Sequence, residues 1–448
     1  MNDEITNNPE DPTPRVTRRS FLGLVGMGTL GAATTRTRRT RATNATTPPS
    51  IAAAPTTTAA PAALGSTTVE ANTTVPRIPN TPGILVMVTL YGGNDGLNTL
   101  SPLDAAPYLS GRGALAYKAS ESLPLAEGLG LHPNLAGFKG LWDTKQLAIV
   151  RGVGYPNPSR SHFRSQDIWS SAVPATFERT GWLGRWYDSV STDPLGMAAI
   201  ASSVPRFLIG RKGSAVVVGG ATASGGSSDF KIATRLLSQP DDSLGSLAAR
   251  VRSTSADLGR VDTVFGPMLA SQSSVSIQTA TLEPGAVARA GNVLDDQLNV
   301  VARLIKGGAP TRAYAVSLGG FDTHANERAN HARLMTILDQ AVTGFLRVMA
   351  ADPNGQGVTV VVYSEFGRRL AANGSAGTDH GTAAPMFVAG AKVKGGFYGD
   401  QPSLTDLDQG DLKFTTDFRS VYSTLLSGVL GADPLSALDK PYANLGFL

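Results

Sequence analysis

Four runs of apolar residues, each ending in a polar loop, constrain the fold of this chain most strongly. They read ILVMVTL, LAIVRGVGY, AYAVSLGG and VTVVVYSEFG, and they begin at residues 84, 147, 313 and 358. Continuous apolar runs of this length are typical of strands buried on both faces of a parallel sheet. We therefore predict four strands of one sheet, each of which delivers a polar loop at its carboxyl end.

Helical patterns lie between and after these strands. Residues 330–350 space their apolar side chains by three and four positions, which indicates one buried helix face: Leu334, Leu338, Val342, Phe345 and Met349. A second helix is predicted over 415–431, with a threonine at its start and a glycine at its end. Strands that alternate with helices predict a three-layer α/β/α fold with a mostly parallel sheet. Ligands of such sheets bind beyond the carboxyl ends of the strands, so we expect the four loops to share one pocket.

The N-terminal region predicts export. Arg18 and Arg19 precede a short, glycine-diluted apolar run that ends near Ala33, and a second basic cluster follows. This pattern favours a twin-arginine (Tat) signal over 1–41 rather than an ordinary secretory signal, and it is too short for a secure membrane span. Residues 42–82 are rich in Thr, Ala and Pro and predict a disordered linker, which leaves a folded domain at 83–448. We expect the Tat machinery as a partner and the periplasm, cell surface or medium as the destination.

Composition excludes several classes of function. The chain has no cysteine, so it can form neither disulfides nor thiolate metal sites, and it has no cysteine nucleophile. The net charge of +4 is modest and no basic patch is interleaved with aromatic residues, so no nucleic-acid partner is expected. The stretch GGATASGGSSD (219–229) predicts a flexible loop, because it lacks the Lys-Ser or Lys-Thr of a phosphate-binding P-loop.

The polar loops are rich in oxygen and imidazole donors, which suit zinc, manganese, magnesium or calcium. In chain order they offer Asn94, Asp95 and Asn98, then Ser159, Arg160, Ser161 and His162, then Asp322 and His324, then Glu365, Asp379 and His380. Each motif also has a structural interpretation: GGND as a turn, SEFGRR as a helix start, and the Asp-x-His pair as part of a loop. His132 could cap or pack instead of reaching the site, and His331 is expected on the surface of a helix.

Seven motifs in order resemble the DUF1501 family of exported proteins: LYGGNDGLNT, LHPNL, VGYPNPSRSHF, GWLGRW, GGFDTHANE, SEFGRR and GTDHGTAAPMFVAGAKVKGGFYGD. The resemblance covers 84–448, and the family is in turn similar to the alkaline phosphatase and sulfatase superfamily. It implies an alkaline-phosphatase-like core with a two-metal site. By this resemblance Asp95 bridges the metals, Asp322 and His324 bind one of them, and Glu365 binds the other. His380 is a further ligand, and Asp379 either orients a ligand or is one itself.

Two motifs depart from the superfamily pattern. Glu365 is followed by Phe366 where the superfamily has adjacent Asp and His, so one ligand is missing, and His162 or Asn94 could replace it. Pro156 stands where sulfatases carry their modified residue, so no formylglycine can form there. Ser159 is then the first candidate for a nucleophile and Ser161 the second, with Arg160 or Arg164 to hold the anion.

The leading hypothesis is an exported metal-dependent hydrolase of phosphate or sulfate esters, or of related small anionic groups, with two cations that bind the attacking and leaving oxygens. The alternative is a non-catalytic binding or scaffold protein that keeps the same fold at the cell surface. A third possibility is an enzyme that modifies polysaccharides by transfer rather than hydrolysis.

Overall fold

The part of the chain that the computed structural model describes comprises residues 83–219, 228–239, 245–270 and 293–448. The predicted signal region (1–41), the predicted linker (42–82) and most of the predicted loop at 219–229 lie outside the described residues. All described residues belong to one unit, Asn72–Leu448. Among them, no helix is both long enough and apolar enough to cross a membrane.

A nine-stranded sheet forms the centre of the fold, in the order β13-β5-β12-β9-β1-β8-β6-β7, with β16 beside β5. Strand β1 (Ile84–Leu90) runs parallel to both β8 (Ala313–Leu318) and β9 (Val358–Ser364), its neighbours on either side. The fourth predicted strand is β5 (Leu147–Gly154). All four predicted strands are therefore confirmed, and each lies in the same sheet.

Strand β12 (Ala384–Ala389) runs antiparallel between β9 and β5, so the sheet is mostly rather than wholly parallel. The remaining strands of the sheet are short and parallel to their neighbours: β6 (Met197–Ala199), β7 (Val216–Val217), β13 (Gly396–Tyr398) and β16 (Thr416–Asp417). Because β12 alone is reversed, its amino end lies at the same edge of the sheet as the carboxyl ends of β1, β5, β8 and β9.

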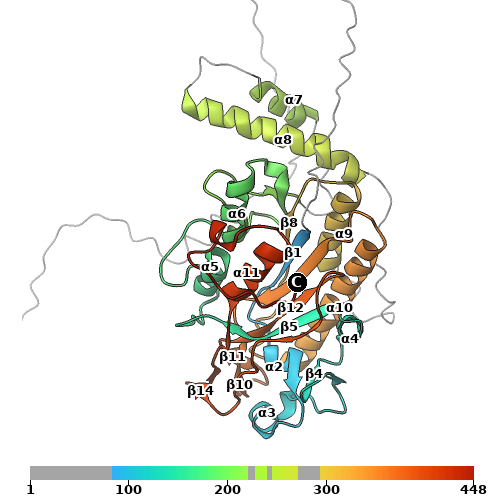
Figure 1. Cartoon of the computed structure of the whole chain (residues 1–448), viewed down its shortest axis with the longest axis vertical. Coiled ribbons are helices and arrows are strands. Elements are labelled where there is room, and N and C mark those ends of the chain that lie inside the picture. The colour runs from blue at the N-terminus through green and yellow to red at the C-terminus, as the bar shows by residue number, and fades with distance from the viewer. Residues whose placement is uncertain (1–82, 220–227, 240–244, 271–292) are drawn as a thin grey trace, which may run out of the picture. The chain divides into compact units, whose positions relative to one another are not determined.

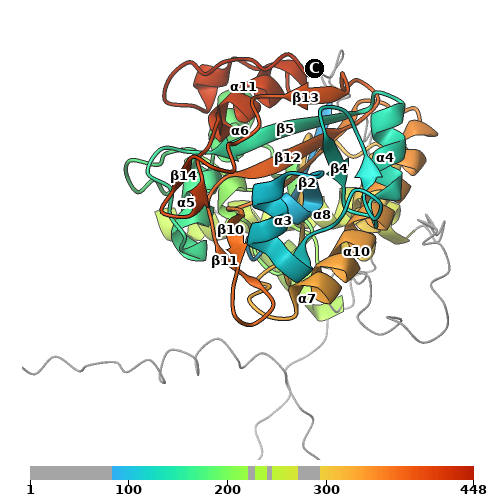
Figure 2. The same cartoon turned by 90° about the horizontal axis from the view of Figure 1, so that it is seen from below.

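Helices cover both faces of this sheet. Alternate residues of β1 point to opposite faces: Val86 and Val88 join one hydrophobic core, whereas Leu85 and Met87 join the other. The first core is closed by α4 (Ala136–Asp143), α9 (Val293–Lys306) and α10 (Glu327–Ala350). The second is closed by α5 (His162–Ser171), α6 (Trp182–Val190) and α11 (Phe418–Gly428). Figure 2 shows the sheet between α10 and α11, which confirms the predicted three-layer α/β/α fold.

Two details of the helix predictions are wrong. His331 does not lie on the surface of α10 but is buried, because the first turns of α10 pack against the loop after β1. Helix α11 is capped by Asp417 instead of a threonine, since its carboxylate accepts a hydrogen bond from the Arg419 N–H.

Smaller elements decorate the core. Helix α7 (Ser228–Leu237) packs on α8 (Ser246–Ala270) (Figure 1), and α2 (Gly96–Thr99) and α3 (Ala106–Arg112) follow β1. Three small sheets consist of β2 (Leu100–Pro102), β3 (Leu123–Pro124) and β4 (Leu129–Leu131); of β10 (Arg368–Ala372) and β11 (Thr378–His380); and of β14 (Leu407–Asp408) and β15 (Asp411–Leu412). Single 3₁₀ turns occur at Gly113–Leu115, Pro194–Gly196, Arg206–Leu208 and Pro434–Ser436.

Candidate metal centre

Two glycines at the end of β1 let the loops of this edge approach one another. Gly92 and Gly93 adopt positive φ angles of 120° and 75°, a conformation that is strained for other residues. A Cβ on Gly92 would lie 2.4 Å from the backbone nitrogen of Asp322, and one on Gly93 would lie 2.3 Å from a ring carbon of Phe366. The GGND motif therefore contributes to the site through its glycine backbone, which brings three loops together.

Arg368 ties these loops to one another. Its guanidinium is buried and donates hydrogen bonds to the carbonyl oxygens of Gly92, Gly93, Phe321 and Thr378. It also donates to Oδ1 of Asp322 at 2.8 Å. Sequence reasoning did not select Arg368, although the signal was present as the first arginine of SEFGRR.

Asp322, His324 and His380 form a close triangle. Oδ1 of Asp322 lies 3.0 Å from Nε2 of both histidines, and the two Nε2 atoms lie 2.9 Å apart. A cation with bonds of about 2.1 Å sets neighbouring ligand atoms roughly 3.0 Å apart in an octahedral arrangement and roughly 3.4 Å apart in a tetrahedral one. The sides of the triangle, 2.9 and 3.0 Å, match the octahedral separation.

The carboxylate of Asp322 is held in its ionised form. Burial opposes ionisation, but hydrogen bonds from His380 and Arg368 and the charge of Arg368 outweigh it and lower the pKa of Asp322 to about 2. Asp322 is therefore an anion at all physiological pH values, as a metal ligand must be.

His162 adds a fourth side chain to this group. Its Nε2 lies 3.6 Å from Oδ2 of Asp322, and its ring packs edge-on against that of His380 with centroids 4.5 Å apart. Ligand atoms of His162, Asp322 and His380 all lie within 4.8 Å of one another. We call Asp322, His162, His324 and His380 the Asp-His cluster.

Each histidine of the Asp-His cluster has an acceptor at its other ring nitrogen. Nδ1 of His162 lies 2.8 Å from Oε1 of Glu365, and Nδ1 of His380 lies 2.9 Å from the carbonyl oxygen of Arg160. Nδ1 of His324 lies 3.5 Å from Oδ1 of Asp379. In a metal-bound state each imidazole would keep one proton at Nδ1, facing its acceptor, and offer the lone pair of Nε2 to the cation. This is how proteins orient histidines that bind metals.

Glu365 and Asp95 have their oxygens occupied by protein donors. Glu365 is buried and accepts hydrogen bonds from the Gly92 N–H, Gln166 Nε2 and the Ser364 hydroxyl, besides its contact with His162. Asp95 is fully buried, caps α2 and forms a two-pronged ion pair with Arg112, with Nη2 to Oδ1 at 2.7 Å. Although burial opposes ionisation, Arg112 holds the pKa of Asp95 well below its usual range. The structure thus joins Glu365 to the Asp-His cluster through His162 and places Asp95 against Arg112.

Residues 282–428 match DUF1501, a family of proteins of unknown function. The matched segment contains Asp322, His324, Glu365, Asp379 and His380, whereas Asp95 and the 159–162 loop precede it. The predicted resemblance to DUF1501 is confirmed for this segment. No curated protein matches the chain.

Several solved structures are similar to this chain in fold. One is a protein in the alkaline phosphatase superfamily from Vibrio parahaemolyticus, with 12% identity, 81% of this chain and 71% of that chain covered, and a TM-score of 0.37. Another is the C-terminal periplasmic domain of EcEptC from Escherichia coli (11% identity, 81% and 88% covered, TM-score 0.36). A third is alkaline phosphatase from the Antarctic bacterium TAB5 (13% identity, 69% and 91% covered, TM-score 0.31).

The remaining predicted donors lie in polar contacts elsewhere. Oδ1 of Asn94 is 3.0 Å from Nε2 of His331. His132 is buried, contacts the Tyr117 hydroxyl at 2.8 Å and accepts the Asn134 N–H at Nδ1. Burial lowers the pKa of His132 to about 3, so it is neutral and has the capping and packing role.

The serine loop touches the Asp-His cluster through its backbone. Oγ of Ser159 accepts the Ser161 N–H at 3.2 Å, and the Ser161 side chain is exposed and does not cap α5. The carbonyl of Arg160 holds His380, while its guanidinium pairs with Asp411, with Nε to Oδ2 at 2.6 Å. Asp411 also pairs with Arg369 at 3.2 Å. Arg164 turns away and donates to the carbonyl of Pro174.

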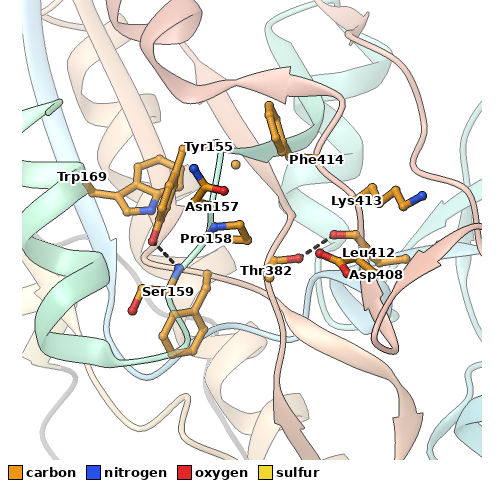
Figure 3. A pocket seen from close by; sticks show the side chains of 12 residues that line it. Tyr155, Asn157, Pro158, Ser159, Trp169, Thr382, Asp408, Leu412, Lys413 and Phe414 are labelled. Atoms are coloured by element: carbon orange, nitrogen blue, oxygen red, sulfur yellow. Dashed lines mark hydrogen bonds between the residues drawn. The ribbon is translucent and has the colours of Figure 1, made fainter. Parts of the chain in front are cut away.

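A pocket of about 340 Å³ adjoins the Asp-His cluster. Trp169 and Tyr155 lie on one side of it and Asp408 and Lys413 on the other (Figure 3). Phe366 lines the pocket and also contacts the Asp-His cluster. The centroid of its ring lies 4.8 Å from the ring centroid of His380 and 4.9 Å from that of His162. The pocket also includes Ser159, so it reaches the serine loop.

Proposed function

We propose that this protein is an exported metal-dependent hydrolase of phosphate or sulfate esters, or of related small anionic groups. The triangle formed by Asp322, His324 and His380 is the observation that supports this proposal most directly. A divalent cation held there would supply Lewis acidity to the phosphoryl or sulfuryl group of the ester. The donor set of carboxylate and imidazole suits zinc, manganese, magnesium or calcium, with imidazole favouring the transition metals.

The residues around the triangle support metal binding because they hold its three side chains in place before a substrate binds. Arg368 holds the Asp322 carboxylate, and the Arg160 carbonyl and Asp379 hold the two histidine rings. Groups held in place by packing and hydrogen bonds need no reorganisation during the reaction, which is a large part of electrostatic catalysis.

The charge beside the Asp-His cluster suits an anionic substrate. Arg160 and Arg369 share the single carboxylate of Asp411, which is buried, so this group carries one surplus positive charge. Surplus positive charge at the mouth of a site raises the local concentration of anions and stabilises the oxygens of a transferred group. We propose that these arginines receive the ester's anionic group.

The pocket behind Phe366 would hold the organic part of the ester. Its volume is within the range of small-molecule sites, and aromatic walls with a few polar groups are their usual lining. Ser159 lies in this pocket and remains the first candidate for a nucleophile, with Ser161 as the second.

Turnover of chromogenic phosphate and sulfate esters by the purified protein tests the function. We expect hydrolysis that a chelator abolishes and that added metal restores. Asp322→Ala and His380→Ala should lose both activity and bound metal, whereas Asp400→Ala, an exposed aspartate away from the cluster, should lose neither. Metal binding without turnover of any ester would favour the binding or scaffold protein.

Export by the Tat route is proposed from the N-terminal sequence. Replacement of both Arg18 and Arg19 by Lys should keep the protein inside the cell, because the receptor reads this pair. The same change at Arg38 and Arg39, in the second basic cluster, is the control. Fractionation of cells that express each variant measures the outcome, and normal export of the first variant would contradict the proposal.

A further inference from the structure

We propose that the Asp-His cluster binds one cation through all four of its side chains, and that Glu365 positions His162 instead of binding a second cation. The cation then has one carboxylate ligand and three imidazole ligands. This inference rests on the metal dependence proposed above, but not on the ester chemistry.

The three histidines of the Asp-His cluster converge on the carboxylate of Asp322. Its histidines come from three loops, with His162 at the start of α5, His324 after β8 and His380 at the end of β11. All three nevertheless direct Nε2 at the carboxylate of Asp322. The distance to the nearer oxygen is 3.0 Å for His324 and for His380, and 3.6 Å for His162. His162 faces Oδ2 while the other two face Oδ1, so the donors surround both oxygens of one anion.

The hydrogen bonds at Nδ1 explain why a cation belongs there. Each Nδ1 faces an acceptor, in Glu365, Asp379 or the Arg160 carbonyl, so each ring can keep a proton there and offer the lone pair of Nε2 to a cation. Without a cation, a proton between His380 and Asp322 holds these two groups together, and a positive ion would replace that proton and join the four side chains.

A second cation has no comparable set of ligands among the described residues around the cluster. Glu365 accepts one backbone N–H and three side-chain donors, so it would have to release them to bind an ion. The carboxylate of Asp95 is fully buried and paired with Arg112. Removing either carboxylate from its donors would leave buried polar groups without partners, which is costly.

Metal content of the full chain tests the number of cations. The protein is stripped with a chelator, reloaded with excess Zn²⁺, dialysed and analysed by mass spectrometry for zinc per chain. We expect one ion, and none in Asp322→Ala. Two tightly held ions per chain would overturn the proposal, and a folded protein that holds no zinc would overturn it together with the metal dependence.

A double-mutant cycle tests the role of Glu365, with zinc affinity measured by competition against a chromophoric chelator. His162→Ala should weaken binding because a ligand is lost, and Glu365→Gln should weaken it by about 10- to 100-fold because an outer partner is lost. If Glu365 acts only through His162, the double variant binds no more weakly than His162→Ala alone. Glu121→Gln, an exposed carboxylate paired with Arg328, is the control and should not change the affinity.

Three results would contradict the assigned role of Glu365. These are additive losses in the double variant, loss of one of two ions in Glu365→Gln, and unchanged affinity in His162→Ala. Far-UV circular dichroism of each variant establishes that it is folded. One bound ion without turnover of any ester would support this inference while contradicting the hydrolase, so the two proposals can fail separately.

Discussion

At the scale of single residues, a buried group of two carboxylates and one arginine supports the first loop. Arg112 pairs closely with Asp95 and lies 3.8 Å from Oε1 of Glu327, and all three side chains are inaccessible to solvent. One guanidinium cannot neutralise two buried carboxylates. Burial and the charge of Asp95 therefore raise the pKa of Glu327 to about 9, so that Glu327 keeps its proton at neutral pH.

This proton makes stability depend on pH. The folded state keeps a proton that unfolded chains release above about pH 4.5, so the contribution of Glu327 to stability decreases as the pH rises from about 4.5 to about 9. Glu327→Gln has no proton to lose and can still accept the hydrogen bond from Thr378. We expect its melting temperature to fall less than that of the wild type between about pH 5 and pH 9. If the melting temperatures of the two proteins fell equally with pH, Glu327 would not be the group that keeps its proton. Glu121→Gln is the control.

At the scale of elements, the β10–β11 hairpin carries much of the Asp-His cluster and its support. Arg368 and His380 are paired across it, and Asp379 lies on its second strand. Gly377 packs directly on the loop after β8: a Cβ there would lie 2.2 Å from the carbonyl carbon of His324. The distance between the hairpin and this loop therefore fixes the distance between His380 and His324.

Gly377→Ala should disturb both stability and metal binding. Overpacking of this kind costs ~1–3 kcal/mol, and the displaced His324 should weaken zinc affinity. Gly374→Ala, in the same hairpin, is the matched control, because a Cβ there meets no atom within 4 Å. Thermal unfolding and chelator competition measure the two effects. Equal behaviour of the two variants would show that the hairpin does not set this distance.

Asp339 joins two helices that cover the same face of the sheet. From α10 it accepts the backbone N–H groups of Gly137, at 3.0 Å, and of Phe138, at 2.8 Å, in the first turn of α4. Asp339→Ala leaves both donors unsatisfied and should cost about 1–2 kcal/mol in the free energy of unfolding by denaturant. Asp339→Asn keeps one acceptor oxygen and should lose less. A larger loss in the Asn variant would contradict this capping role.

At the scale of the whole molecule, the core and the Asp-His cluster are separate. The two hydrophobic cores lie on the faces of the sheet, whereas the cluster lies beyond the carboxyl ends of β5 and β8 and the amino end of β12. None of its four side chains belongs to either core. The fold is therefore expected to form without a metal, and the metal is expected to stabilise what is already folded.

Removal of the metal by a chelator should leave the far-UV circular dichroism spectrum unchanged and lower the melting temperature. Linkage gives the size of the effect: a cation at 100 times its dissociation constant contributes about 2.7 kcal/mol to stability. Titration with Zn²⁺ should restore the melting temperature, and in Asp322→Ala it should have no effect. Loss of secondary structure on chelation would instead mean that the metal is part of the folding core.

The sequence by itself determined four strands of the nine-stranded sheet, the layers and the edge at which the polar loops meet. Apolar runs and helical spacing report burial locally, and parallel strands place their carboxyl ends together, so Asp322, His324 and His380 could be chosen without coordinates. Only the tertiary structure decided which carboxylates have oxygens that are not already occupied by protein donors. Asp95 is paired with Arg112 from the next helix, and Glu365 with a histidine 203 positions away. Such pairings depend on how distant loops pack, because a side chain's hydrogen-bond partners are set by its neighbours in space.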